Sequence, residues 1–113
     1  MQPEDEVRIR HMIGAAESVR RFVAGRQRAD LDNDEMLRFA LTRAIEIIGE
    51  AASRVSQPTQ ALTPDVPWRE ATAMRNRLVH AYFDVDLDML WKTAQEAVPD
   101  LLARLTALLR PEG

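Results

Sequence analysis

The stretch from Asn33 to Ser56 constrains the fold more than any other part of the chain, because apolar side chains surround it almost completely. Their spacing of three and four residues is the period of an α-helix. These apolar residues are Met36, Leu37, Phe39, Ala40, Leu41, Ala44, Ile45, Ile47, Ile48, Ala51 and Val55. A helix with so narrow a polar stripe is stable only when most of its surface is covered. We expect other helices, or a second copy of the chain, to bury it.

The same period predicts helices on both sides of this stretch. One is expected from Pro3 to Ala24 and ends at Gly25, since glycine commonly follows the last residue of a helix. A shorter helix is expected from Pro67 to His80, with Pro67 at its first position, where the missing N–H is not needed. In between, Asp32 and Glu35 have the spacing of a capping box, and residues 56–66 are expected to form a loop.

A fourth helix is expected from Leu87 to Leu109, with Asp86 as its N-cap. Pro99 lies in the middle of this helix and should kink or split it, because proline removes a backbone hydrogen bond and clashes with the preceding turn. No segment shows the sustained period-two alternation that is typical of strands. The sequence therefore predicts an all-α fold, an up-down four-helix bundle, in one domain spanning residues 1–113.

Composition narrows the cellular setting and the chemistry. The chain has no cysteine, which excludes disulfides, thiolate metal sites and cysteine nucleophiles and fits a cytoplasmic protein. Its first ten residues are too charged for a signal peptide, and no apolar run reaches the roughly 20 residues needed to span a membrane. The net charge of −3 argues against a general nucleic-acid binder, so any RNA site must be a local patch.

The segment from Met74 to Phe83 carries the groups best suited to catalysis, namely Arg75, Asn76, Arg77, His80 and Tyr82. RNA can be cut with few groups, since its own ribose 2′-hydroxyl is the nucleophile. A histidine can move the proton, and an arginine can stabilise the charge that builds up on the phosphate oxygens. This chemistry requires neither a metal nor another cofactor. The simpler interpretation is a histidine near a helix end beside surface arginines.

Geometry restricts how Arg75 and His80 can cooperate. Five residues of an ideal helix separate two side chains by about 140°, so they do not share a face. They meet at one phosphate only if the helix ends near His80, if the long Arg75 side chain reaches across, or if a second molecule contributes.

The spacing of Arg75, His80 and Tyr82 resembles the signature of the HEPN superfamily, and in particular of the HepT-like toxins. The resemblance extends to Pro67-Trp68-Arg69-Glu70, to Phe83-Asp84-Val85-Asp86 and to Ile48-Gly49-Glu50-Ala51. It implies a helical homodimer with metal-independent endoribonuclease activity that leaves a cyclic phosphate. Arg75 and His80 would be catalytic, and Asn76, Arg77 and Glu50 would support them.

The resemblance also implies a partner. Tyr82 matches the tyrosine that the cognate antitoxin, a minimal nucleotidyltransferase of the MntA kind, modifies with AMP in a type VII-like toxin–antitoxin system. The alternative is a non-catalytic HEPN protein that binds a nucleotidyltransferase or its substrate. Such proteins typically lack the arginine–histidine pair that this chain has.

Two further groups of polar residues have ordinary interpretations. Glu50 and Arg54, four residues apart on the polar stripe, are expected to form an ion pair on a solvated helix face. His11 is expected to be a surface residue rather than a ligand.

Overall fold

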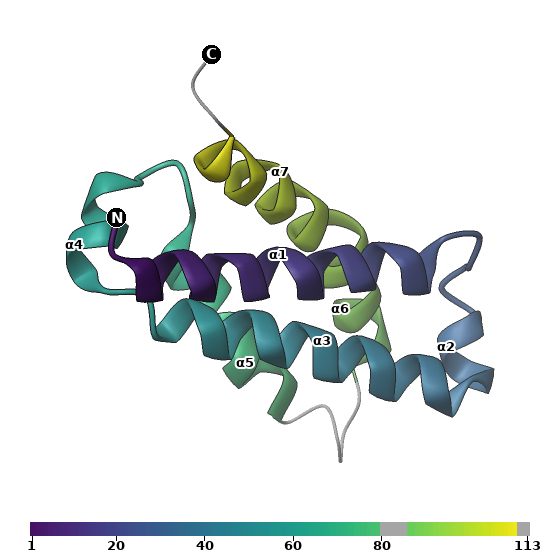
Figure 1. Ribbon diagram of the computed structural model, residues 1–113. Coiled ribbons are helices and arrows are strands. Elements are labelled where there is room, and N and C mark those ends of the chain that lie inside the picture. Colours follow the sequence, from purple (N-terminus) through teal and green to yellow (C-terminus); the bar gives the residue numbers. More distant parts are fainter. Residues whose placement is uncertain (80–85, 111–113) are drawn as a thin grey trace.

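The computed structural model describes residues 1–79 and 86–110, and along residues 77–79 it describes the backbone alone. Every regular element in these ranges is helical (Figure 1). The elements are α1 (Pro3–Val23), α2 (Asp30–Asn33), α3 (Glu35–Ser53), α4 (Gln57–Leu62), α5 (Trp68–Val79), α6 (Leu87–Lys92), the π-helical turn η2 (Thr93–Ala97) and α7 (Val98–Leu109). The predicted all-α fold is confirmed. The long predicted helices correspond to α1, α3, α5 and the run α6–η2–α7, and α2 and α4 are additional.

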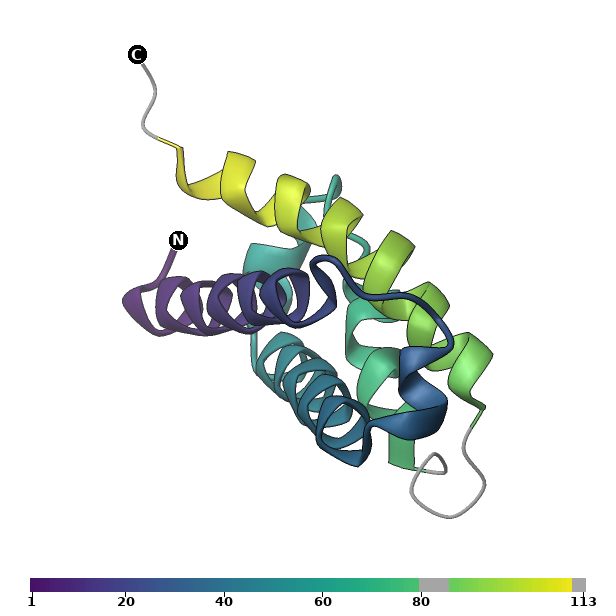
Figure 2. The ribbon, with the colours of Figure 1, turned by 90° about the vertical axis from the view of Figure 1, so that its right-hand side faces the viewer.

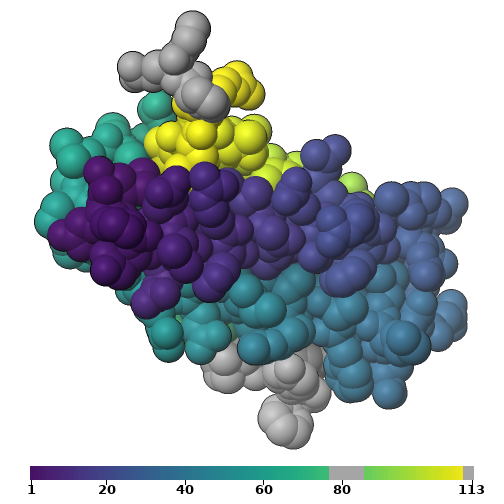
Figure 3. Space-filling view, in the orientation of Figure 1, coloured from purple at the N-terminus to yellow at the C-terminus, as the bar shows by residue number. Residues whose placement is uncertain are grey.

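Helix α3 lies at the centre of the packing, between α1 and α5, while α7 packs against α1 (Figures 1 and 2). Helices α1 and α3 run side by side in opposite directions, and together they form much of the face shown in Figure 3. The largest side chains that are fully buried are Ile9, Met12, Leu31, Leu41, Ile45, Ile48, Leu90, Leu101 and Leu105. The prediction that other helices bury α3 is confirmed for most of its apolar residues, whereas Met36 and Phe39 near its beginning are exposed. Among the described helices, none combines the length and the apolar character needed to cross a membrane.

The start of α3 differs from the prediction. Asp34, not Asp32, is its N-cap, and the Asp34 carboxylate accepts a hydrogen bond from the Leu37 backbone N–H at 3.0 Å. This bond, followed by a second from Arg26, holds the pKa of Asp34 below its ordinary value. Asp32 instead belongs to α2 and pairs with Arg28 at 3.2 Å. The capping box was wrong because an extra helical turn, α2, occupies the segment just before α3.

The segment predicted as a loop, residues 56–66, contains helix α4. Ser56 is its N-cap, and Pro58 lies in the first turn, where proline is tolerated. Asp5 of α1 anchors this helix: it accepts hydrogen bonds from the Ser56 N–H at 2.9 Å, the Ser56 hydroxyl at 2.6 Å and the Thr59 hydroxyl at 2.5 Å. Local sequence did not reveal α4 because its stabilising partner lies 51 residues away along the chain.

Pro99 interrupts the fourth helix without splitting it. Residues 93–97 widen into the π-helical turn η2, and Pro99 then falls in the first turn of α7, a position where proline is tolerated. The run from α6 to α7 therefore stays continuous (Figure 2). As predicted, Asp86 caps α6, and it accepts a hydrogen bond from the Met89 N–H at 2.9 Å.

Candidate functional site

Helix α5, which carries the predicted catalytic motif, is fixed at its beginning by Trp68. The indole ring is buried, and its Nε1–H lies 3.2 Å from the Thr63 carbonyl and 3.0 Å from the Thr63 hydroxyl. Both the apolar ring and its one polar atom are thus satisfied inside the molecule. Trp68 orients α5 and is not available to stack on a base.

The last turns of α5 press against α3 at Gly49. A Cβ atom at Gly49 would lie 2.6 Å from the backbone nitrogen of Arg75 and 2.7 Å from its Cβ. Contacts this short involve backbone, which cannot move aside as the end of a flexible side chain can. Only glycine permits α3 and α5 to approach this closely. The contact fixes the position of the Arg75 backbone relative to α3.

Gly49 is the residue whose role sequence reasoning missed. In the sequence it stands out only as part of Ile48-Gly49-Glu50-Ala51, a segment that resembles the family. Its signal was a glycine inside a strongly helical pattern, where it costs about 1 kcal/mol relative to alanine and so usually has a packing reason. Sequence alone did not say which residue approaches it.

The side chains of Arg75 and Asn76 are both accessible: Arg75 is partly buried and Asn76 is exposed. None of the ion pairs between described residues involves Arg75. A guanidinium without a carboxylate partner keeps its donors for another anion. Helix α5 is described to Val79, so His80, Tyr82 and the side chain of Arg77 lie outside the described part. How Arg75 and His80 face each other therefore stays a prediction.

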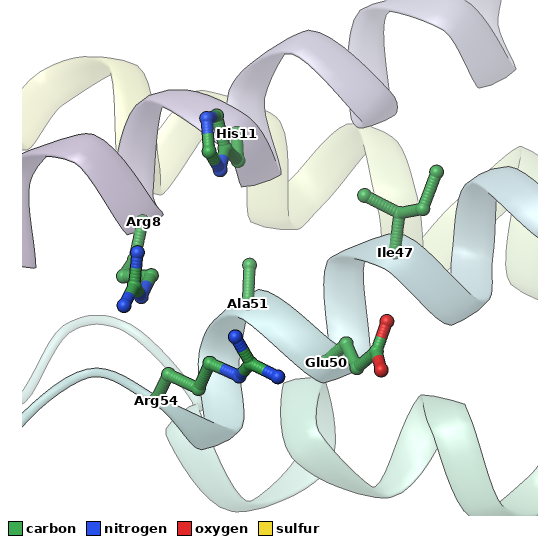
Figure 4. A pocket seen from close by; sticks show the side chains of 6 residues that line it. All are labelled: Arg8, His11, Ile47, Glu50, Ala51 and Arg54. Carbon is green, nitrogen blue, oxygen red and sulfur yellow. The ribbon is translucent and has the colours of Figure 1, made fainter.

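The other face of α3 borders a surface hollow of about 190 Å³ between α1 and α3 (Figure 4). It is lined by Arg8 and His11 of α1 and by Ile47, Glu50, Ala51 and Arg54 of α3. The expected ion pair between Glu50 and Arg54 is absent from the described contacts, so that prediction was wrong. The two side chains instead lie along the hollow, and Glu50 directly follows Gly49 in the chain. His11 is exposed, as predicted. It also lines this hollow.

The comparison with known families decides the identity of the fold. A family model described as "Ribonuclease HepT-like" matches residues 12–108, which include both Gly49 and the segment from Arg75 to Tyr82. The chain belongs to the HepT-like ribonuclease family. The match begins at Met12, so Arg8 and His11 precede it.

Similar proteins are named as ribonucleases. "Probable ribonuclease HepT" of Thermococcus cleftensis is 45% identical over 75 residues, which are 66% of this HepT-like chain and 68% of that protein. "Putative RNase TTE0752" of Caldanaerobacter subterraneus subsp. tengcongensis is 31% identical over 104 residues, 92% of this chain and 93% of that protein. No solved structure matches this chain.

Proposed function

We propose that this HepT-like protein is a metal-independent endoribonuclease in which Arg75 and His80 act on the scissile phosphate. The observation that supports the proposal is the accessible guanidinium of Arg75, which has no carboxylate partner in the described part of the chain and whose backbone is held against Gly49. The ribonuclease names of its relatives point to the same chemistry.

In the proposed reaction, the ribose 2′-oxygen attacks the adjacent phosphorus. The P–O2′ bond forms and the P–O5′ bond breaks, which leaves a 2′,3′-cyclic phosphate and a free 5′-hydroxyl. A base removes the 2′-hydroxyl proton, and an acid donates a proton to the departing 5′-oxygen. Arg75 stabilises the charge on the non-bridging oxygens, with Asn76 and Arg77 supporting it.

One histidine cannot be base and acid in the same step, so we further propose a homodimer in which the two copies of His80 face one phosphate. Met36 and Phe39 of α3 are large apolar side chains with exposed fractions of 82% and 53%. Exposed apolar side chains of this kind often form contacts between subunits. A mixed dimer with His80 alkylated in one subunit should cut at less than half the normal rate. A higher rate would contradict the shared site.

We also propose a toxin–antitoxin role, in which an MntA-like nucleotidyltransferase adds AMP to Tyr82 and silences cleavage. A neutral phenol would become a bulky anionic group two residues from His80. Purified antitoxin with ATP should add one AMP per chain to the wild-type protein and none to Tyr82→Phe.

The test of the nuclease incubates purified protein with RNA in the presence of EDTA. We expect the wild type to cut and His80→Ala to be roughly 100- to 10,000-fold slower. Arg69→Ala is a matched control, since Arg69 is an exposed arginine of the same helix and should cut at the wild-type rate. Cutting by His80→Ala at the wild-type rate would refute the role of His80, whereas no cutting by the wild type would favour the alternative, a non-catalytic partner of a nucleotidyltransferase.

A further inference from the structure

The hollow between α1 and α3 gathers positive charge from two helices. Arg8 and His11 lie one turn apart on α1, and Arg54 approaches from α3 (Figure 4). Among the described residues that line the hollow, Glu50 is the acidic one. Even with a neutral histidine, two guanidinium groups and one carboxylate leave the hollow with an excess of positive charge, although the whole chain has a net charge of −3.

The two arginines of the hollow differ from Arg10 and Arg104 in having no carboxylate partner among the described residues. Arg10 pairs with Glu6 at 3.0 Å, and Arg104 pairs with Asp100 at 3.0 Å. Across the described ranges 1–79 and 86–110, neither Arg8 nor Arg54 makes an ion pair. Arg8 and Arg54 therefore keep their donors for another anion, as do other described arginines without an ion pair, such as Arg20 and Arg69.

One of these groups also carries a buried donor with nothing to bind. The Arg8 Nε–H is shielded from solvent and has no hydrogen-bond partner among the described residues. A buried donor without an acceptor costs free energy, and the cost is larger when the group is charged. An anion that draws the Arg8 side chain toward the hollow would offer this donor an acceptor and remove the cost.

We propose that the hollow binds a phosphodiester group of the RNA substrate, at a distance from the scissile bond. The inference rests on the proposed ribonuclease function. An Arg fork suits two phosphate oxygens, His11 offers a ring N–H, and the apolar side chains of Ile47 and Ala51 reduce solvent screening beneath the anion.

Size and position favour a backbone phosphate. A hollow of about 190 Å³ is smaller than the roughly 300–1,000 Å³ of sites that enclose whole small molecules, so it admits a charged group rather than a complete nucleoside. Glu50 lines the hollow, and the preceding residue, Gly49, contacts Arg75. The same turn of α3 therefore borders both the hollow and the predicted catalytic helix, which allows one RNA strand to contact both.

The test measures binding of a 2′-O-methyl RNA oligonucleotide, which lacks the nucleophile and so stays intact. Fluorescence anisotropy gives Kd at salt concentrations from 50 to 200 mM for the wild type and for Arg8→Gln/Arg54→Gln. The control is Arg10→Gln/Arg104→Gln, which removes the same charge from arginines that have carboxylate partners. Thermal unfolding verifies that each variant is folded.

We expect Arg8→Gln/Arg54→Gln to weaken binding about tenfold, the effect of one lost charge-assisted contact. The slope of log Kd against log salt should fall by about 0.7, the value for one phosphate on a single strand. The control should change Kd less than threefold. With cleavable RNA, kcat/KM of Arg8→Gln/Arg54→Gln should fall about tenfold, mainly through KM.

Different failures lead to different conclusions. If the wild type cuts RNA and Arg8→Gln/Arg54→Gln binds with the Kd and salt slope of the control, the hollow is not an RNA site and the proposed nuclease stands. If the wild type does not cut, but Arg8→Gln/Arg54→Gln still loses affinity and slope, the phosphate site stands and the proposed nuclease fails. A loss of affinity with an unchanged slope overturns the phosphate contact.

Discussion

Two polar clusters lie one turn apart on α1, and they differ in whether their groups have partners. At Asp5 the buried carboxylate accepts three hydrogen bonds from Ser56 and Thr59. At Arg8, three residues later, a buried donor has no partner in the described part of the protein, and the nearby Arg54 has none either. A satisfied cluster holds α1 and α4 together, whereas an unsatisfied one is available to a ligand. Arg75 belongs to the second kind.

This comparison predicts opposite effects on cutting rate and on stability for the two kinds of residue. Substituting Arg75 should slow cutting but leave stability unchanged. Arg75→Ala removes the guanidinium that we propose stabilises the transition state and that has no carboxylate partner in the described part of the chain, so we expect the cutting rate to fall about 100- to 1,000-fold. The midpoint of thermal unfolding should stay within about 2 °C of the wild type. Single-turnover cleavage and calorimetry on the same sample measure both. A large loss of stability would place Arg75 with the structural residues instead.

Asp5→Ala should show the reverse pattern. It leaves the Ser56 and Thr59 donors without their acceptor at a site that is 2% exposed, so we expect a loss of about 3 kcal/mol in the free energy of unfolding. Under conditions where the variant remains folded, its cutting rate should match the wild type. Urea unfolding measures the stability, and a loss below about 1 kcal/mol would mean that water replaces the acceptor.

Gly49→Ala should connect the two readouts, because Gly49 packs the scaffold directly against Arg75. The added methyl group would force α3 and α5 apart, and overpacking of this kind typically costs about 1–3 kcal/mol, partly offset by the higher helix propensity of alanine. We expect lower stability together with slower cutting, since Arg75 moves with its helix. Gly14→Ala is the matched control, because a Cβ there meets nothing within 4 Å. If Gly49→Ala cuts normally, the position of Arg75 is less constrained than the contact indicates.

Acid titration gives the smallest of these effects and isolates the Asp5 carboxylate. The hydrogen bonds, first from the Ser56 hydroxyl, then from Thr59 and the Ser56 backbone, hold the pKa of Asp5 below its ordinary value of 3.8. Folding therefore favours the ionised form, and this contribution is complete above the unfolded pKa and is lost as pH falls through the lower folded pKa. The stability difference between wild type and Asp5→Asn should be constant from pH 7 to 5 and narrow below about pH 4. A difference that grows in acid would refute this assignment.

The helices that sequence predicted best are those with a long apolar stripe. The boundaries expected for Pro3 to Ala24 lie within one residue of α1, and the Asp86 cap of α6 is where the spacing placed it. These features depend on residues within one or two turns of each other. Gly25, with φ at 73°, follows α1 in the conformation that glycine adopts readily.

Two of the predictions that failed depended on distant parts of the chain, whereas the capping box failed locally, at the extra turn α2. Helix α4 is held by Asp5, so local proline and threonine content indicated a loop. Glu50 and Arg54 have the spacing of a helical ion pair, yet both line a hollow whose opposite wall is α1. An i,i+4 pair contributes only about 0.2–0.5 kcal/mol, so surrounding groups readily override it.

The sequence by itself determined the helical fold class, the family and the catalytic candidates Arg75 and His80, because periodicity and motif spacing are properties of one continuous segment. Only the tertiary structure decided that Gly49 lies against Arg75 and that Arg8 and Arg54 share a hollow without carboxylate partners among the described residues. A partner within the same helix can be expected from spacing, as for Arg10 and Glu6, but a partner from another helix depends on which groups folding brings within about 4 Å, and that distance exists only after the chain has folded.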